Sequence, residues 1–181
     1  SSYSDWADYD NFSPDITVEG SDSKLLPAYL SLIRLSDSAI QNLVSYFEAQ
    51  EEPTIIVFFG DHQPADSIVR PVWKLNGKDD ADLTDEEEAL RYKVPFFIWA
   101  NFDIETENDL EISANYLAAK TLDAAGLPKS AYDNFLSQLR TEVPVISANH
   151  VTLSDGTFTT ASKQKDLLYD YQTLQYYLLF D

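Results

Sequence analysis

The chain lacks cysteine and methionine altogether, and only five of its 181 residues are glycine. The absence of cysteine excludes disulfide bonds, thiolate nucleophiles and cysteine-ligated metals. No apolar run reaches the roughly 18 residues that a membrane-spanning helix needs, and no signal peptide opens the sequence. We therefore expect a fragment of an exported protein, with any membrane anchor upstream of this chain.

Basic residues are scarce as well. The chain has 12 lysines and arginines against 31 aspartates and glutamates, which gives a formal net charge of −19. Without a basic patch it cannot displace counterions from phosphates, which argues against nucleic-acid binding, and an anionic membrane surface repels it. The simplest interpretation is an acidic, well-solvated exported surface; a specific cationic partner is the alternative.

Apolar residues are ample: 44% of the chain is hydrophobic and 13% aromatic, enough for the core of one domain. Their recurrence at intervals of three, four and seven predicts a helix over residues 25–50. Ser113 near a cap and a Gly-Leu-Pro stop after residue 125 predict another over 112–125. Two more are predicted over 132–141 and 163–180, the last of them amphipathic. Two polar, acidic stretches, residues 1–24 and 67–91, predict a surface loop and a surface insertion. A turn at Asp155-Gly156 predicts a small antiparallel ribbon over residues 151–159.

The most informative segment is residues 54–64, TIIVFFGDHQP. Six apolar or β-branched residues in a row are typical of a strand buried on both faces, as in parallel sheets covered by helices. Gly60 permits a sharp departure from the strand, and Pro64 stiffens the loop. Asp61 and His62 therefore stand beyond a strand end, where open α/β sheets bind ligands. The alternative for such a pair is a local turn with a locally hydrogen-bonded histidine.

A second strand pattern, YKVPFFIWA at residues 92–100, follows the insertion. The order of GDHQP and YKVPFFIWA resembles the C-terminal half of the sulfatase-like catalytic domain of lipoteichoic acid synthases and related phosphoglycerol transferases, in the alkaline phosphatase superfamily. The likeness runs from about Leu25 to the end of the chain and includes a closing helix around Tyr171–Tyr176.

The resemblance implies that Asp61 and His62 are ligands to one divalent metal, Mn²⁺ or Mg²⁺. A carboxylate with a neutral imidazole is also compatible with Zn²⁺. Members of the family use a threonine nucleophile from the N-terminal half of the domain, and Thr17, in an acidic loop, does not match it. We therefore expect no catalytic residue within this chain and a missing N-terminal half as its partner.

The expected fold is α/β: residues 1–181 form the C-terminal part of one αβα layered domain, with a largely parallel sheet and a small antiparallel ribbon. Strands 54–59 and 94–99 are predicted to be neighbours and parallel. The resemblance implies a phosphoglycerol transferase that acts on a phosphatidylglycerol-like lipid and a glycerol-phosphate polymer. It would work at the extracellular face of a bacterial membrane, anchored by upstream transmembrane helices. The alternatives are a sulfatase or phosphoethanolamine transferase, or a non-catalytic acidic binding domain.

Other residues carry weaker expectations. The segment that directly follows the metal loop contains Arg70, Trp73 and Lys74, which could contact a phosphoglycerol head group. A packed tryptophan with solvated charged side chains explains these residues equally well. Asp37 falls on the apolar stripe of the first helix and is expected to need a hydrogen-bonding partner there. His150 is expected to be structural.

Overall fold

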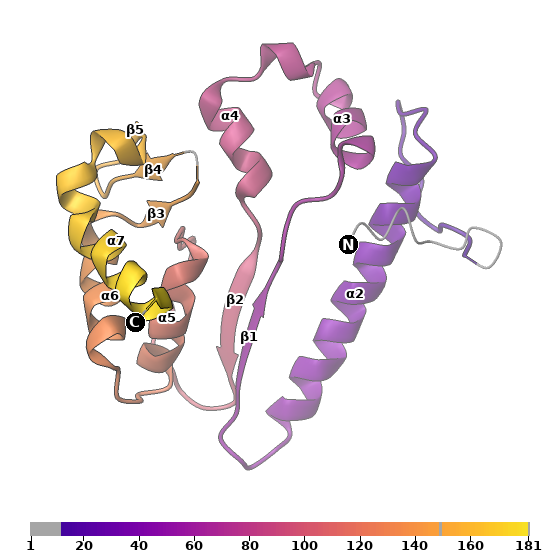
Figure 1. Cartoon of the computed structure of the whole chain (residues 1–181). Coiled ribbons are helices and arrows are strands. Elements are labelled where there is room, and N and C mark those ends of the chain that lie inside the picture. Colours follow the sequence, from indigo (N-terminus) through magenta and orange to yellow (C-terminus); the bar gives the residue numbers. More distant parts are fainter. Residues whose placement is uncertain (1–11, 149, 181) are drawn as a thin grey trace. The chain divides into compact units, whose positions relative to one another are not determined.

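The computed structural model describes residues 12–148 and 150–180. The chain forms two compact units, the first ending at Asp103 and the second beginning at Ile104 (Figure 1). Both units combine helices with short strands, so the expected α/β class is confirmed. Of the loop expected over residues 1–24, residues 1–11 lie outside the described residues. Within the described ranges, no helix is both long enough and apolar enough to cross a membrane.

Over residues 12–103, the first unit contains one long helix, two strands and a helical insertion between the strands. Its elements are α2 (Leu25–Glu48), β1 (Ile55–Phe59), α3 (Asp66–Leu75), η1 (Asp80–Asp82), α4 (Asp85–Ala89), η2 (Leu90–Tyr92) and β2 (Phe96–Ala100). The helix predicted over residues 25–50 is therefore confirmed. Inside the insertion, α4 has a capped start: the Thr84 hydroxyl accepts the Glu87 N–H, and the Glu87 carboxylate accepts the Thr84 N–H.

Burial in α2 is confined to its N-terminal part. Leu26, Ala28 and Ser31 are buried there, and the Ser31 Oγ accepts the N–H groups of Asp15 and Ile16 at 3.1 and 3.2 Å. These bonds fix the segment before α2 along the helix. Asp37 lies farther along and is exposed, so the expectation that it sits on a buried face is wrong. The reason is that few of the described residues pack against α2 around Asp37, so most side chains of this stretch are exposed.

Strands β1 and β2 pair with each other, but antiparallel, with Ile55 opposite Ala100 and Phe59 opposite Phe96. The prediction of parallel neighbours is therefore wrong. An ion pair of 2.8 Å joins Asp66, the first residue of α3, to Arg91, near the end of η2. Because the insertion starts and ends at the same place, β2 must run back along β1. Both described sheets, β1–β2 and β3–β4–β5, are antiparallel throughout.

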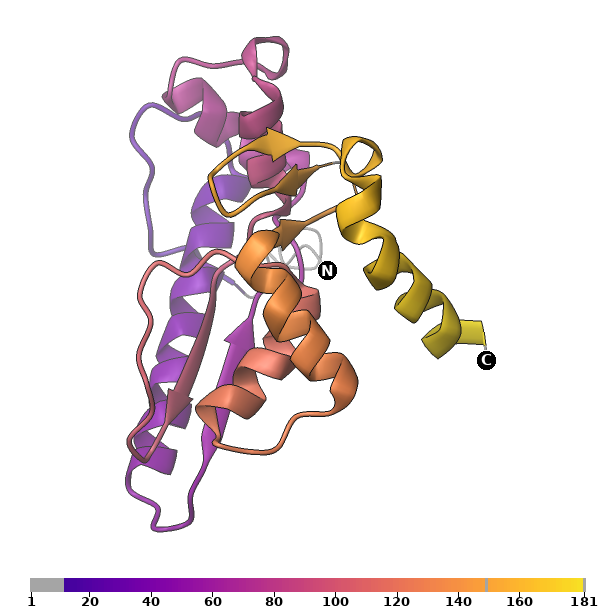
Figure 2. The same ribbon diagram turned by 90° about the vertical axis from the view of Figure 1, so that its left-hand side faces the viewer.

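The second unit combines helices with a three-stranded sheet, and Figure 2 shows these elements from a second side. Its elements are η3 (Ala114–Tyr116), α5 (Leu117–Ala124), α6 (Ala131–Glu142), β3 (Val145–Ile146), β4 (Val151–Thr152), β5 (Phe158–Thr159), η4 (Ala161–Lys163) and α7 (Lys165–Phe180). The predicted helices are confirmed, and so is the antiparallel ribbon, which β3 extends by one strand. The core includes Tyr116, Leu136, Val143, Val151 and Leu168.

Candidate functional site

The loop that follows β1 is fastened to the segment leading into β2. The Gly60 N–H donates to the Pro95 carbonyl at 3.0 Å, and the Gln63 side-chain amide donates to the Lys93 carbonyl. A Cβ on residue 60 would lie 3.0 Å from the Cβ of Val94, tighter than nine in ten real Cβ contacts, so Val94 would have to shift to make room. The close approach of the two segments therefore favours glycine at position 60.

Asp61 and His62 lie between the residues that make these two hydrogen bonds, Gly60 and Gln63. The His62 Nε2 is 3.5 Å from the Asp61 Oδ2. The His62 side chain is 50% exposed and the Asp61 side chain 78% exposed. The backbone N–H of His62 donates to the Asp61 Oδ1 at 3.0 Å, and its Nδ1 lies 2.8 Å from the Gln63 carbonyl oxygen. A carbonyl can only accept, so Nδ1 carries the hydrogen in this contact. In the neutral ring, Nε2 is then the nitrogen with the lone pair.

This geometry fits a pair of metal ligands. Two donor atoms that each lie about 2.1 Å from one cation are about 3.4 Å apart at a tetrahedral centre and about 3.0 Å apart at an octahedral one, and the observed Nε2–Oδ2 separation of 3.5 Å is nearer the tetrahedral value. One carboxylate oxygen and one imidazole nitrogen are donors that suit Mn²⁺ or Zn²⁺. Within the described ranges, however, no group of three or more histidine, aspartate or glutamate side chains converges. The assignment of Asp61 and His62 as metal ligands therefore stays a prediction.

Two of the three weaker candidates, Arg70 and Trp73, make other contacts in the insertion. Arg70 pairs with Asp80 at 2.7 Å and with Asp66 at 3.5 Å. The Arg91 guanidinium lies over the Trp73 ring, 5.5 Å from its centroid. The hydrogen bond and charge of Arg91, with a smaller contribution from Arg70, lower the pKa of Asp66.

These contacts account for Arg70 and Trp73 without a ligand, while Lys74 is exposed in the last turn of α3. Their role in substrate binding stays a prediction. Sequence reasoning missed Gln63, although it directly follows the proposed ligands, because a glutamine side chain in a loop gives no sign of its distant partner.

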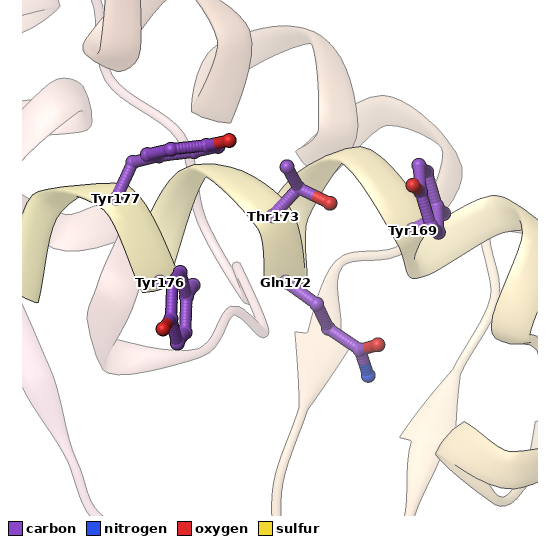
Figure 3. A pocket seen from close by; sticks show the side chains of 5 residues that line it. All are labelled: Tyr169, Gln172, Thr173, Tyr176 and Tyr177. Atoms are coloured by element: carbon purple, nitrogen blue, oxygen red, sulfur yellow. The ribbon is translucent and has the colours of Figure 1, made fainter. Parts of the chain in front are cut away.

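The second unit carries an open hollow on α7 (Figure 3). It measures about 290 Å³ and is lined by Tyr169, Gln172, Thr173, Tyr176 and Tyr177. These residues form one stripe of the helix, distinct from the buried Leu168 and Tyr171. The lining offers aromatic rings, hydroxyls and an amide, but no carboxylate or imidazole.

His150 also lies in the second unit, stacked on Phe158 with ring centroids 4.7 Å apart. Its Nδ1 is 2.8 Å from the Ser147 Oγ, and its backbone N–H donates to the same oxygen at 3.1 Å. Burial lowers its pKa. The local hydrogen bonds and the ring stack support the expected structural role.

Comparison with known proteins places the chain in a family. A model described as Sulfatase matches residues 2–127, more than half of the chain, so the chain belongs to the sulfatase family. It is 24% identical over 176 residues to a Rhizobium meliloti (strain 1021) protein whose name assigns it to cyclic beta-1,2-glucan modification. The match covers 91% of this chain and 27% of that protein.

A solved structure gives the fold comparison. The phosphoglycerol transferase GacH of Streptococcus pyogenes, in complex with sn-glycerol-1-phosphate, matches with a TM-score of 0.60 at 19% identity. The match covers 89% of this chain and 36% of that one. The similarity confirms a sulfatase-like fold for a chain that spans only about a quarter to a third of these two proteins' length.

Proposed function

We propose that this chain is the metal-binding part of a phosphoglycerol transferase of the lipoteichoic acid synthase type. The observation that carries the proposal is the Asp61–His62 pair, whose Oδ2 and Nε2 atoms lie at a separation suited to one shared cation. The solved relative with the similar fold is named a phosphoglycerol transferase and is described with sn-glycerol-1-phosphate. That ligand supports a phosphoglycerol group as the transferred unit, taken from a phosphatidylglycerol-like lipid.

In the proposed reaction the residues of this chain bind the cation and fix its position. Asp61 supplies a carboxylate oxygen and His62 supplies Nε2, while the Gly60 and Gln63 contacts keep the loop against the β2 segment. A bound Mn²⁺ would polarise a phosphoryl oxygen and lower the pKa of a coordinated hydroxyl. The nucleophile, a threonine in the family, and the remaining ligands would come from the rest of the same domain.

The setting and acceptor form part of the proposal. We place the domain at the extracellular face of a bacterial membrane, held by transmembrane helices outside this chain, with a glycerol-phosphate polymer as acceptor. The name of the Rhizobium meliloti relative supports a glucan hydroxyl as an alternative acceptor. A sulfatase or phosphoethanolamine transferase activity would use the same two ligands and differ in the residues outside this chain.

The test uses the full-length protein that contains this chain. Asp61→Ala and His62→Ala should each abolish phosphoglycerol transfer, because losing a ligand removes charge that stabilises the phosphoryl transition state. Asp103→Ala, an exposed carboxylate of the same unit, is the matched control and should keep activity. Transfer that survives both ligand substitutions would overturn the proposal.

The 181-residue chain provides a second test. A catalytic cation of this class needs about four donors and an activated nucleophile, whereas the chain offers two donors. It should therefore bind Mn²⁺ weakly and cleave phosphodiesters no faster than the Asp61→Ala, His62→Ala double variant. Metal-dependent turnover by the chain alone would show that it carries a nucleophile of its own.

One observation favours a second candidate, the non-catalytic binding domain. The hollow on α7 presents three tyrosine rings with an amide and a hydroxyl, groups that combine an apolar face with hydrogen-bonding tips and suit a neutral polyhydroxylated ligand such as a glycan. Calorimetric titration with β-1,2-linked glucan oligosaccharides tests this candidate. Binding should be lost in Tyr176→Ala and Tyr177→Ala and kept in Tyr46→Ala, an exposed tyrosine on α2.

A further inference from the structure

Gln63 contacts both its neighbour and a distant segment. Its carbonyl oxygen lies 2.8 Å from the His62 Nδ1, while its side-chain amide donates to the Lys93 carbonyl, 30 residues away. The side chain is half-buried, in contrast to the exposed Asp61 and His62. One residue thus connects the imidazole of the candidate metal pair to the segment that leads into β2.

The contact with Nδ1 selects one form of the imidazole. A neutral histidine carries its hydrogen on either Nδ1 or Nε2, and the nitrogen that ligates a metal must be the one without it. Donation from Nδ1 to the Gln63 carbonyl leaves the lone pair on Nε2, the atom 3.5 Å from the Asp61 Oδ2. Outer contacts of this kind set the orientation and tautomer of ligating histidines.

The side-chain bond of Gln63 helps to fix where that carbonyl lies. The loop is fastened before Asp61 by the bond from Gly60 to Pro95 and after His62 by the bond from Gln63 to Lys93. With both in place, the peptide plane after Gln63 has a fixed direction. Pro64 already favours an extended backbone at Gln63; without the second bond, the loop as a whole can shift and move this carbonyl away from the ring.

We propose that Gln63 is a positioning residue, whose amide bond to Lys93 holds the His62 imidazole in the Nδ1–H tautomer with Nε2 beside Asp61. The proposal concerns the tautomer of His62, which can be measured without a metal, so its core can be tested independently of the activity. Its consequence for metal affinity rests on the proposed function. Substituting Gln63 should therefore change the tautomer of His62 as well as weaken binding of Mn²⁺.

Long-range ¹H–¹⁵N NMR of the metal-free chain, at a pH where the rings are neutral, reads the tautomer directly. The chain has two histidines, His62 and His150, so a His150→Gln spectrum assigns both rings. His62 should be in the Nδ1–H form in the unsubstituted chain. It should shift towards the Nε2–H form in Gln63→Ala and in Gln63→Glu, whose carboxylate has the same shape but cannot donate to a carbonyl.

The matched control is Gln50→Ala, which removes another amide-to-carbonyl bond of the same unit, from Gln50 to Tyr46. It should leave the His62 spectrum unchanged, and the amide spectrum of β1 and β2 reports whether each variant is folded. Gln63→Glu keeps the experiment decisive if Gln63→Ala fails to fold. An Nε2–H tautomer in the unsubstituted chain, or an unchanged tautomer in Gln63→Glu, overturns the proposal.

Titration with Mn²⁺, followed by paramagnetic broadening of the His62 ring signals, separates this proposal from the proposed function. Loss of an outer-shell partner typically weakens metal binding about 10- to 100-fold, and we expect that range for Gln63→Glu. If the tautomer shifts as expected but Mn²⁺ never broadens His62, the positioning role stands and the metal assignment fails. If the tautomer is unchanged in Gln63→Glu and Mn²⁺ broadens His62 equally in that variant and in the unsubstituted chain, the positioning role fails and the metal assignment stands.

Discussion

Asn101 and Thr54 bind each other through two hydrogen bonds: the Asn101 Oδ1 accepts the Thr54 N–H at 2.8 Å, and the Asn101 N–H donates to the Thr54 carbonyl at 3.2 Å. The Asn101 side-chain amide also lies 3.1, 3.0 and 2.9 Å from the carbonyl oxygens of Phe47, Gln50 and Glu52, respectively. One side chain thus joins the end of α2 and the start of β1 to the end of β2.

Asn101→Ala should destabilise the first unit. The substitution removes an acceptor and two N–H donors from backbone partners, of which those on Thr54 and Phe47 are partly buried; a net value of about 1 kcal/mol for each bond gives about 2–3 kcal/mol. Urea unfolding followed by tryptophan fluorescence measures the change. The control is Asn76→Ala, whose side chain makes one exposed bond to Val72 and should cost less than about 1 kcal/mol. Equal effects of the two substitutions would contradict the linking role of Asn101.

Gly60→Ala should also destabilise the first unit, for a steric reason. The new Cβ would lie 3.0 Å from the Val94 Cβ and 3.4 Å from its Cγ1. Overpacking of this kind typically costs about 1–3 kcal/mol. Thermal unfolding of the single variant and of the Gly60→Ala, Val94→Gly double variant tests the cause. The double variant should be more stable than the sum of the two single changes predicts, whereas simple additivity would mean that Val94 is not the obstacle.

The positions of the elements could be predicted from the sequence because they depend on local patterns. The apolar runs before Gly60 and around Phe97 predicted β1 and β2, and the Asp155-Gly156 turn predicted the ribbon. The direction in which β1 and β2 pair could not be predicted, since continuous apolar strands are typical of parallel sheets. What sets their direction is the return of the insertion, closed by Asp66 and Arg91, a contact between distant residues.

The candidate site divides in the same way. Asp61 and His62 were identified because a strand end followed by an acid and an imidazole is a local signal that matched a known motif. Gln63 binds the Lys93 carbonyl, 30 residues away, and Asn101 binds the Phe47 carbonyl, 54 residues away. Nothing in the sequence distinguishes these two carbonyls from any other backbone carbonyl. Sequence alone gives no means of choosing such a partner.

Tyr116→Phe should destabilise the second unit. Tyr116 is 1% exposed, and its hydroxyl donates to the Val143 carbonyl at 2.8 Å within the core. Burial raises the pKa of this hydroxyl, so it stays protonated as a donor. Removing it leaves a buried carbonyl without that bond, at a cost of about 1–3 kcal/mol. Chemical unfolding followed by circular dichroism measures the loss, and Tyr176→Phe, on an exposed ring, should change nothing.

The stability of the second unit should fall in mild acid because of His150. Burial lowers the pKa of this ring in the folded chain below its ordinary value of 6.5, with Glu111 acting in the opposite direction. The unfolded chain therefore binds the proton more readily. The stability gained from the neutral ring is present above pH 6.5 and is lost as the pH falls through the folded-state pKa.

His150→Phe isolates this effect, because phenylalanine can keep the stack on Phe158 and cannot titrate. Melting temperatures between about pH 5 and pH 8 cover the range in which histidine changes charge. The loss of stability on acidification should be smaller in the variant than in the unsubstituted chain. The lowered pKa values of Asp66 and Glu107 should not interfere, because their contributions are lost only at more acidic pH, below the ordinary carboxylate values of 3.8 and 4.5. Identical pH profiles for the two proteins would show that protonation of His150 does not oppose folding.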